Sequence, residues 1–362
     1  MLNVVLTGGG TGGHLYPGLA VADELAKRIP CRFLFIGTKR GLESSVVPGR
    51  GMAFKTVWIG GLRRGRFLAN LLFPLKMAVS FLQALVIQAR FRPDLCVGTG
   101  GYVSWPVITA ASLLGCHTVI QEQNEKPGLV TRVLALSADA VHLSFDSSIR
   151  YFRKKNRLHV SGNPTRADLV RPRTESAYER FGLNPRRPTV LVFGGSQGAR
   201  SLNQAFVQMA GPLMTQTGVQ ILWAAGPRWS RDIENQIRHW GDRIRVFPYI
   251  AEMGLAYAVS VLTVCRSGAS TAAEVARLGL AVVFVPFPDA AGRHQEANAR
   301  AMSDAGAAVL VREGPDFPSR LGTEVMDLIR SPERRRTLSA KIANFARPGA
   351  AEAVVTQILE TL

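Results

Sequence analysis

The chain has 362 residues, of which 47% are hydrophobic and 19% charged, so it is long enough for two globular domains and unlike a disordered or fibrous protein. Its 44 Lys and Arg against 26 Asp and Glu give a net charge of +18. This charge fits anionic lipid, an acidic substrate or nucleic acid as partner, and equally an ordinary soluble protein of basic pI. Four cysteines without CxxC spacing argue against a disulfide scaffold and indicate a reducing cytosol, and the N-terminus lacks the pattern of a signal peptide.

The first half of the chain alternates short apolar runs with segments of helical length. Strands are expected at 3–7, 32–36, 95–98, 118–121 and 140–143, with a helix over 15–27. This alternation is typical of an α/β protein with a parallel, doubly wound sheet.

The segment 62–92 interrupts this pattern, because basic residues are interleaved with apolar ones and no apolar run reaches the ~20 residues that span a bilayer. One interpretation is a peripheral contact with an anionic membrane surface. The alternative is a buried crossover helix over 77–89 that follows a solvated basic loop. The residues expected at the membrane are Arg63, Arg64, Arg66, Phe67, Leu71, Leu72 and Phe73.

The pattern restarts in the second half. Strands are expected at 189–193, 220–223, 244–247, 262–264 and 281–285, with a helix from about residue 200. The glycines of 9–13 align with those of 194–198 at a constant offset of 185, so a Rossmann-like unit opens twice. We therefore expect two Rossmann-like domains that face a cleft, with ligands beyond the carboxyl ends of the strands.

The first glycine loop, 8–13, satisfies GxGxxG between a strand and a helix and predicts an anion cradle. The acidic residue that holds a ribose is missing at the end of the second strand, where Lys39 and Arg40 stand instead, so NADP remains an alternative. His14 follows this loop at the expected start of a helix. The positive end of the helix dipole favours a neutral imidazole, which could accept a hydroxyl proton; the alternative is a histidine packed beneath the loop.

The second half offers a second anion cradle, 194–198, in which Ser196 adds a hydroxyl donor. Arg166 could add a bidentate phosphate contact. Thr271 and Glu274 have the spacing of a capping box, although Glu274 could instead bind the ribose hydroxyls of a nucleoside. No DxD, HxxxH or HExxH motif occurs, so we expect no metal and no cofactor.

Seven motifs occur in order along nearly the whole chain: GGGTGGHLYPGLAVADEL, VGTGGYVSWP, EQN, GNPTR, VFGGSQGARSLN, VCRSGASTAAE and VPFP…HQEANA. Together they resemble the MurG family, the bacterial UDP-N-acetylglucosamine:N-acetylmuramyl-(pentapeptide)-pyrophosphoryl-undecaprenol N-acetylglucosaminyltransferases. The resemblance implies the GT-B fold and an inverting transfer of N-acetylglucosamine to the 4-hydroxyl of the muramyl sugar of lipid I, which yields lipid II for peptidoglycan. A sugar-nucleotide epimerase of similar two-domain build and a nucleic-acid binder are competing classes, although no nucleic-acid motif is present.

The resemblance also implies roles for single residues. His14 is the candidate general base, and Glu122 of the EQN motif is the competing one. Two departures are visible: Gln121 stands where the family often has histidine, and Trp105 where it often has a small residue. The implied UDP-N-acetylglucosamine contacts are Thr11, Gly12, Gly13, Asn124, Arg166, Ser196, Ile250, Ala269, Ser270, Thr271, Ala272, Ala273, Glu274 and Gln295.

The expected organisation is an acceptor and membrane domain over 1–161, a donor domain over 162–340, and a C-terminal helix within 341–362 that packs back on the first domain. The implied partners are UDP-N-acetylglucosamine, lipid I, an anionic membrane surface and other cell-wall synthesis proteins. The implied location is the cytoplasmic face of the bacterial inner membrane, with roles in cell shape and division.

Overall fold

The computed structural model describes residues 1–61, 71–165 and 167–362, which fold into two compact units. Unit 1 comprises residues 1–166 and 347–362, and unit 2 comprises residues 167–346. The boundaries therefore lie after residues 166 and 346 instead of the expected 161 and 340. The first boundary moves because Gly162, which has φ of 89°, lies directly against the side chain of Arg347. The two segments that connect the units therefore contact each other within unit 1.

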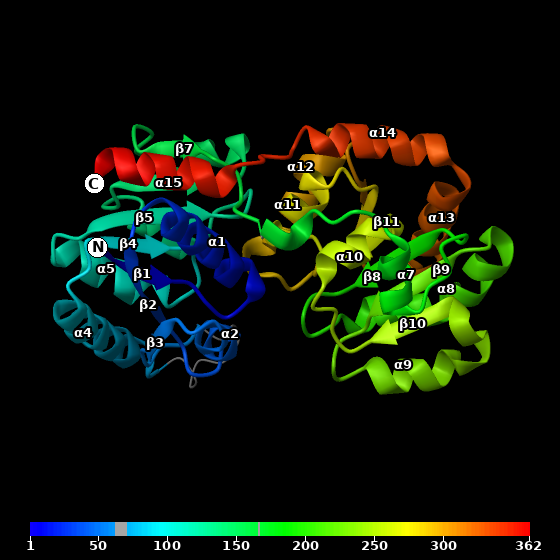
Figure 1. The fold of residues 1–362 in the computed structure, drawn as a ribbon, viewed down its shortest axis with the longest axis horizontal. Coiled ribbons are helices and arrows are strands. Elements are labelled where there is room, and N and C mark those ends of the chain that lie inside the picture. The colour runs from blue at the N-terminus through cyan, green and yellow to red at the C-terminus, as the bar shows by residue number, and fades with distance from the viewer. Residues whose placement is uncertain (62–70, 166) are drawn as a thin grey trace. The chain divides into compact units, whose positions relative to one another are not determined.

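The described residues of unit 1 form a seven-stranded parallel sheet of order β3-β2-β1-β4-β5-β6-β7 (Figure 1). Its strands are β1 (Leu2–Thr7), β2 (Cys31–Gly37), β3 (Ala53–Thr56), β4 (Leu95–Gly98), β5 (His117–Glu122), β6 (Ala140–Leu143) and β7 (Leu158–Val160). Its helices are α1 (Gly12–Arg28), α2 (Glu43–Gly49), α4 (Phe73–Phe91), α5 (Ser104–Leu113), α6 (Leu129–Leu134) and α15 (Ala350–Thr361), with a 3-10 helix at Asp146–Tyr151. The expected strands are all present.

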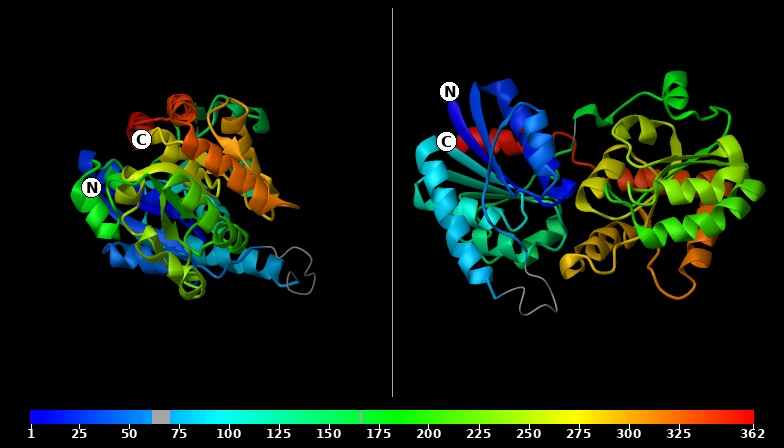
Figure 2. Two further views of the ribbon diagram at one scale, coloured as in Figure 1. Left: turned by 90° about the vertical axis from the view of Figure 1, so that its right-hand side faces the viewer. Right: turned by 90° about the horizontal axis from the view of Figure 1, so that it is seen from below.

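Helices cover both faces of this sheet, which explains the continuous apolar runs of its strands. Val5 packs with α4, α5 and α6 on one face. Val4 and Leu6 point to the other face, against α1, α2 and α15. These layers are visible from two further directions in Figure 2.

The C-terminal helix α15 lies alongside α1 (Figure 1). Val354 and Ile358 are fully buried in the core that contains Leu15. At the edge of this contact, Arg28 of α1 donates to the Thr356 hydroxyl at 2.8 Å. The last residues of the chain therefore complete the first unit.

Helix α4 is longer than the expected 77–89 and buries only one face, through Ser80, Ala84 and Gln88. Trp105, one of the two departures from the resemblance, packs against Phe81 of this helix with ring centroids 6.4 Å apart. The expectation of a core helix is thus correct for half of α4. Within the described ranges, no helix has the length and apolarity needed to cross a membrane.

The described part of unit 2 repeats the architecture with a six-stranded parallel sheet of order β10-β9-β8-β11-β12-β13. Its strands are β8 (Thr189–Phe193), β9 (Gln220–Ala224), β10 (Ile244–Phe247), β11 (Ser260–Cys265), β12 (Val282–Phe284) and β13 (Val309–Leu310). Its helices are α7 (Glu175–Phe181), α8 (Arg200–Thr217), α9 (Ser230–Ile237), α10 (Met253–Ala258), α11 (Ala269–Arg277), α12 (His294–Ser303), α13 (Phe317–Arg330) and α14 (Pro332–Ala343), with 3-10 helices at Ala167–Leu169, Arg238–Arg243 and Ala291–Arg293.

The strand order of unit 2 is that of the nucleotide-binding Rossmann fold, and unit 1 contains the same order with one strand added at the edge. The direction of winding reverses between β1 and β4 in unit 1 and between β8 and β11 in unit 2. Ligands of such sheets bind beyond the carboxyl ends of the strands at this reversal. The fold therefore directs attention to the loops that follow these four strands.

Candidate functional site

In unit 1 the loops that follow β1 and β4 are interlocked. A Cβ on Gly8 would lie 2.0 Å from the Thr99 hydroxyl, and one on Gly100, which has φ of 101°, would lie 2.8 Å from Nδ1 of His14. Glycine is thus required at both positions because the two loops approach each other too closely for a side chain. This contact brings the first glycine loop, His14 and Thr99 together.

His14 lies in the first turn of α1, which begins at Gly12, three residues before the expected start. Its ring is half-buried. Nδ1 lies 2.9 Å from the Thr99 carbonyl oxygen and 3.0 Å from Oε1 of Gln123. The structure therefore places the candidate base beside the EQN motif, and one edge of its ring is held by the protein.

Glu122, the competing candidate base, is 3% exposed and occupied by its own loop. One carboxylate oxygen accepts from the backbone and side-chain amides of Asn124, each at 3.0 Å, and the other accepts from the Gly128 amide at 3.1 Å. These bonds fix the turn that presents Asn124. The contacts of Glu122 are those of a side chain that stabilises its own loop.

Glu43 is a residue of this site that the motifs did not indicate. Its side chain is fully buried, and Oε2 accepts the backbone N–H of Gly10 at 3.0 Å, while Oε1 accepts the N–H and the hydroxyl of Thr38 at 3.1 and 2.8 Å. A carboxylate at this position fills the space that the glycine loop leaves, since a Cβ on Gly9 would lie 2.4 Å from it. The only sequence signal was the acidic first residue of a short helix.

A cavity of about 890 Å³ opens beside this loop in unit 1. Gly10 and the cations Lys39 and Arg40 line one part of it, and Trp58 and Tyr102, each about half exposed, line another. Cations with aromatic rings suit an anionic, sugar-bearing ligand.

In unit 2 the second glycine loop, 194–198, follows β8 and leads into α8. Gly198 has φ of 74°, and a Cβ there would lie 2.0 Å from the Ala225 carbonyl oxygen, so the loop packs tightly on the end of β9. Ser196 lies exposed in the loop. An exposed hydroxyl and loop amides before the N-terminus of a long helix form an anion-binding arrangement.

A cavity of about 730 Å³ lies over this loop, and arginines give it positive charge. Arg266 is nearly buried: it donates to the carbonyls of Val285 and Pro286 and forms an ion pair with Glu313. Arg200 and Arg228 are exposed, with guanidinium carbons 6.0 and 5.0 Å from the ring centre of Trp229. Neither was predicted, because an arginine after a glycine loop or in an irregular segment has no distinctive spacing.

The nucleoside loop predicted over 269–274 forms the first turns of α11. The expected capping box is wrong: α11 begins directly after Gly268, so Thr271 lies inside the helix and caps nothing. Only three residues, 266–268, separate the end of β11 from the start of α11. Glu274 is buried and accepts a hydrogen bond from the Tyr257 hydroxyl at 2.9 Å.

Gln295 lies at the start of α12 and borders the 730 Å³ cavity. Its Oε1 accepts the backbone N–H of Phe287 at 2.9 Å, and its carbonyl accepts from the buried Ser267 hydroxyl at 2.7 Å. Ile250 is buried, in the loop after β10.

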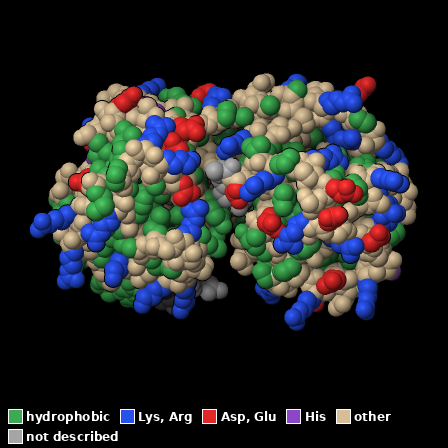
Figure 3. All heavy atoms as spheres, in the orientation of Figure 1, with side chains coloured by type: hydrophobic (Ala, Val, Ile, Leu, Met, Phe, Trp, Pro, Cys, Tyr) green, Lys and Arg blue, Asp and Glu red, His purple; other side chains and the backbone are tan. Residues whose placement is uncertain are grey.

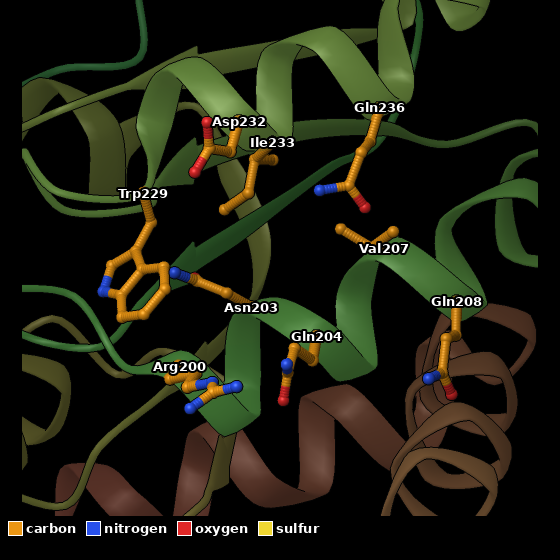
Figure 4. Close-up of a pocket in the computed structure, with 9 residues that line it drawn as sticks. All are labelled: Arg200, Asn203, Gln204, Val207, Gln208, Trp229, Asp232, Ile233 and Gln236. Atoms are coloured by element: carbon orange, nitrogen blue, oxygen red, sulfur yellow. The ribbon is translucent and has the colours of Figure 1, made fainter.

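A second groove of about 520 Å³ continues between α8 and α9 (Figure 4). Trp229, Asn203 and Arg200 lie at one end, and Gln208 and Gln236 at the other. It shares Arg200 and Trp229 with the cavity over the glycine loop.

The predicted site residues that the structure describes divide between the two units. Unit 1 holds Thr11, Gly12, Gly13, His14, Glu122 and Asn124, and unit 2 holds Ser196, Ile250, Ala269, Ser270, Thr271, Ala272, Ala273, Glu274 and Gln295. Arg63, Arg64, Arg66, Phe67 and Arg166 lie outside the described residues. Within the described part of the chain, no group of three His, Cys, Asp or Glu side chains could hold a metal ion.

Comparison with known proteins matches both units to one family. The model described as "Glycosyltransferase family 28 N-terminal domain" matches residues 4–143, and the "Glycosyltransferase family 28 C-terminal domain" matches residues 189–354. A relative from Chlorobium limicola, named UDP-N-acetylglucosamine--N-acetylmuramyl-(pentapeptide) pyrophosphoryl-undecaprenol N-acetylglucosamine transferase, is 40% identical over 99% of both chains.

Solved structures share the fold of this chain over nearly its whole length. The crystal structure of Acinetobacter baumannii MurG is similar with a TM-score of 0.77 at 28% identity and covers 99% of this chain and 100% of its own. A UDP-GlcNAc 2-epimerase from Neisseria meningitidis, bound to UDP-GlcNAc, has a TM-score of 0.72 at 13% identity over 99% of this chain and 100% of its own. At that identity the likeness concerns the fold alone.

Proposed function

The chain belongs to the MurG family of N-acetylglucosamine transferases, and we propose that it transfers N-acetylglucosamine from UDP-N-acetylglucosamine to the muramyl 4-hydroxyl of lipid I. The product is lipid II, the peptidoglycan precursor. The observation that carries this proposal is that unit 2 has an arginine-lined cavity over its glycine loop and that unit 1 has a histidine directly after its own glycine loop.

The nucleoside and diphosphate of the donor bind unit 2 in this proposal, while Thr11, Gly12, Gly13 and Asn124 of unit 1 stay predicted contacts of UDP-N-acetylglucosamine. The diphosphate lies over the loop 194–198, where Ser196 and the loop amides donate to it and Arg200 and Arg228 balance its charge. The nucleoside extends toward α11, with Glu274 as the acceptor for ribose hydroxyls. Because arginines and helix amides supply the positive charge, donor binding needs no divalent metal.

The acceptor binds unit 1, with its pyrophosphate and sugar in the cavity beside Lys39, Arg40 and Tyr102. The acceptor 4-hydroxyl oxygen forms the bond to the anomeric carbon of the donor. The bond from that carbon to the UDP oxygen breaks, and its electron pair leaves with UDP. His14 takes the hydroxyl proton, and attack from the face opposite UDP inverts the anomeric configuration.

A lipid-linked acceptor requires the enzyme to work at a membrane surface. Helix α4 supports this: Leu75, Leu82 and Val86 are 52%, 58% and 49% exposed, and their spacing places them on one helical face. Leu71 and Leu72 extend this apolar stripe beyond the start of the helix, at 67% and 52% exposed. We propose that the stripe enters an anionic cytoplasmic leaflet while Arg63, Arg64 and Arg66 contact its headgroups.

The distribution of positive charge alone does not identify the membrane-binding surface. Figure 3 shows Lys and Arg side chains spread over the visible face of both units. The apolar stripe on α4 is therefore the more specific indication of a membrane contact. Cell division and cell-shape roles, and contacts with other wall-synthesis proteins, follow in this proposal from lipid II supply.

The alternative of an NADP oxidoreductase conflicts with the position of Glu43. In a dinucleotide site the amides of the first glycine loop face the pyrophosphate. Here the Gly10 amide is already paired with a buried carboxylate, whose negative charge would repel that pyrophosphate.

The experiment that tests the proposal measures transfer of radiolabelled N-acetylglucosamine from its UDP donor to a lipid I analogue in the presence of EDTA. We expect labelled lipid II and one UDP released for each sugar transferred. Conversion of the donor into an epimeric UDP-sugar without a labelled acceptor product would identify an epimerase and contradict the proposal.

A further inference from the structure

We propose that Gln123, oriented by Gln121, is a positioning residue that holds His14 as the tautomer protonated on Nδ1, so that Nε2 is the atom that receives the acceptor proton. The inference rests on the proposed role of His14 as the base. It concerns the side-chain amides of Gln121 and Gln123. These residues are 0% and 1% exposed, so neither amide is open to a substrate.

The orientation of the first amide is fixed by a backbone carbonyl. The side-chain nitrogen of Gln121 donates to the carbonyl of Gly162 at 2.9 Å. A carbonyl oxygen can only accept, so the NH₂ group of Gln121 must face Gly162. The side-chain oxygen of Gln121 therefore faces the other way, toward Gln123.

The second amide is fixed by two acceptors. The side-chain nitrogen of Gln123 lies 2.6 Å from the side-chain oxygen of Gln121 and 2.8 Å from its backbone carbonyl oxygen. Both contacts require donation from Gln123. Its oxygen is thus directed to Nδ1 of His14, 3.0 Å away.

The histidine tautomer follows from these two steps. Nδ1 of His14 faces the Gln123 oxygen and the Thr99 carbonyl oxygen, the latter at 2.9 Å. Two acceptors at this distance require a proton on Nδ1, and in the neutral ring Nε2 then carries the lone pair. The chain of amides begins at the Gly162 carbonyl and ends at the Thr99 carbonyl, and neither end can reverse.

This arrangement also acts during the reaction. When Nε2 takes the proton, the positive charge spreads over the ring to the Nδ1–H group. The bonds to Gln123 and Thr99 become charge-assisted and so strengthen as the transition state is approached. Gln123 thus stabilises the imidazolium without touching the substrate.

The test compares Gln123→Met with Gln123→Glu in the full-length enzyme. Methionine keeps the volume but removes the acceptor, so kcat should fall about tenfold, which is the effect of roughly 1.4 kcal/mol, while KM for UDP-N-acetylglucosamine stays within about twofold of wild type. The carboxyl group of glutamic acid, which stays protonated when buried against the two Gln121 oxygens, still donates to them and still accepts from Nδ1–H, so the kcat of Gln123→Glu should exceed that of Gln123→Met. Gln88→Met is the matched control, since Gln88 is also fully buried in unit 1 but donates to the Val107 carbonyl, away from His14.

The tautomer itself is read from ¹⁵N-histidine spectra, with His14 assigned by loss of its signal in His14→Gln. A protonated Nδ1 and the kcat order Glu above Met support the inference. A protonated Nε2 overturns it, and so does a kcat order of Met above Glu. If His14→Gln leaves kcat unchanged, the proposed base is wrong, and the spectrum still decides the tautomer independently.

Discussion

The carboxylate of Glu43 lies directly beneath Gly10 and accepts its backbone N–H at 3.0 Å. The two residues are 33 positions apart, and the carboxylate also accepts two bonds from Thr38. The buried carboxylate of Glu43 thus stabilises the shape of the first glycine loop. A ligand can bind only to the loop groups that do not contact this carboxylate.

Glu43→Gln should disturb this loop because an amide cannot accept from both Gly10 and Thr38. The NH₂ group of the new glutamine must then face the donor of either Gly10 or Thr38. We expect the free energy of unfolding to fall by about 1.5–3 kcal/mol, which is the range for a hydrogen bond to a charged group. The KM for the lipid I analogue should rise, while the Kd for UDP, whose proposed site lies in unit 2, should not change. Glu24→Gln, a change of the same kind at the far end of α1, serves as the control. An unchanged acceptor KM in folded Glu43→Gln would show that the loop does not bind the acceptor.

Glu274→Ala should weaken UDP binding at least tenfold, since hydrogen bonds to a charged group contribute about 1.5–3 kcal/mol. Tyr257→Phe is the matched variant, because it removes the 2.9 Å hydrogen bond to Glu274 but leaves the carboxylate in place. We expect Tyr257→Phe to lower stability slightly and to leave the Kd for UDP within about twofold, as judged by calorimetric titration. Equal loss of affinity in the two variants would mean that Glu274 acts only by holding Tyr257.

Membrane binding should depend on the apolar stripe and on charge together. Leu75→Gln with Leu82→Gln should release the protein from vesicles that contain anionic lipid, and so should the triple change of Arg63, Arg64 and Arg66 to Gln, since each basic residue near the surface contributes about 1 kcal/mol.

The control for that experiment is the exposed set Arg186, Arg231 and Arg238 of unit 2, changed to Gln, which alters the net charge equally. It should leave vesicle binding intact in a flotation assay at physiological salt. If the control variant is released from the vesicles to the same extent, net charge alone accounts for membrane binding.

The stability of unit 1 should fall in acid through His142. This side chain is 1% exposed, and its nitrogens lie 3.2 Å from the Ser161 hydroxyl and 3.1 Å from Oε1 of Gln357 on α15. The pKa of His142 is lowered from 6.5 to about 4, mainly by burial, with a smaller contribution in the same direction from His159, while the hydrogen bond to Gln357 opposes the shift. Between these pH values the unfolded chain binds a proton that the native state does not, so stability is lost as pH falls from 6.5 toward 4 and is constant in this respect above 6.5.

His142→Leu should remove this dependence. Between pH 7 and 4.5, the wild type should lose on the order of 2–3 kcal/mol more in free energy of unfolding than the variant, from urea titrations. His239→Leu, at an exposed position in unit 2, is the control and should follow the wild type. Parallel losses in His142→Leu and wild type would exclude His142 as the source.

The sequence predicted the strands that run continuously apolar, because strands of a sheet covered on both faces need such runs. It missed β3, whose alternate residues are exposed, β7, whose three residues are only partly buried, and β13, which has two residues. The glycine loops were recognised since a tight turn before a helix restricts residue type. The partners of those loops were not, because Gln123 meets His14 across 109 residues and Glu43 meets Gly10 across 33, and no local pattern encodes such contacts.

The choice between the two candidate bases could not be made from sequence either. Glu122 and His14 follow different strands, and only the structure gives the Glu122 carboxylate three backbone and side-chain donors from its own loop. A carboxylate so engaged stabilises the turn at Asn124. Removing it should therefore affect the loop more than the chemical step.

The most direct test of the account is the turnover of His14→Ala beside that of Glu122→Gln, in the lipid I transfer assay at saturating substrates. Loss of a general base lowers the rate by about 10²–10⁴, so kcat of His14→Ala should fall by that factor while its Kd for UDP stays near wild type. Glu122→Gln should lower kcat less. If Glu122→Gln is the more damaging change to kcat, and His14→Ala mainly weakens UDP binding, then His14 belongs to the phosphate-binding loop and is not the base.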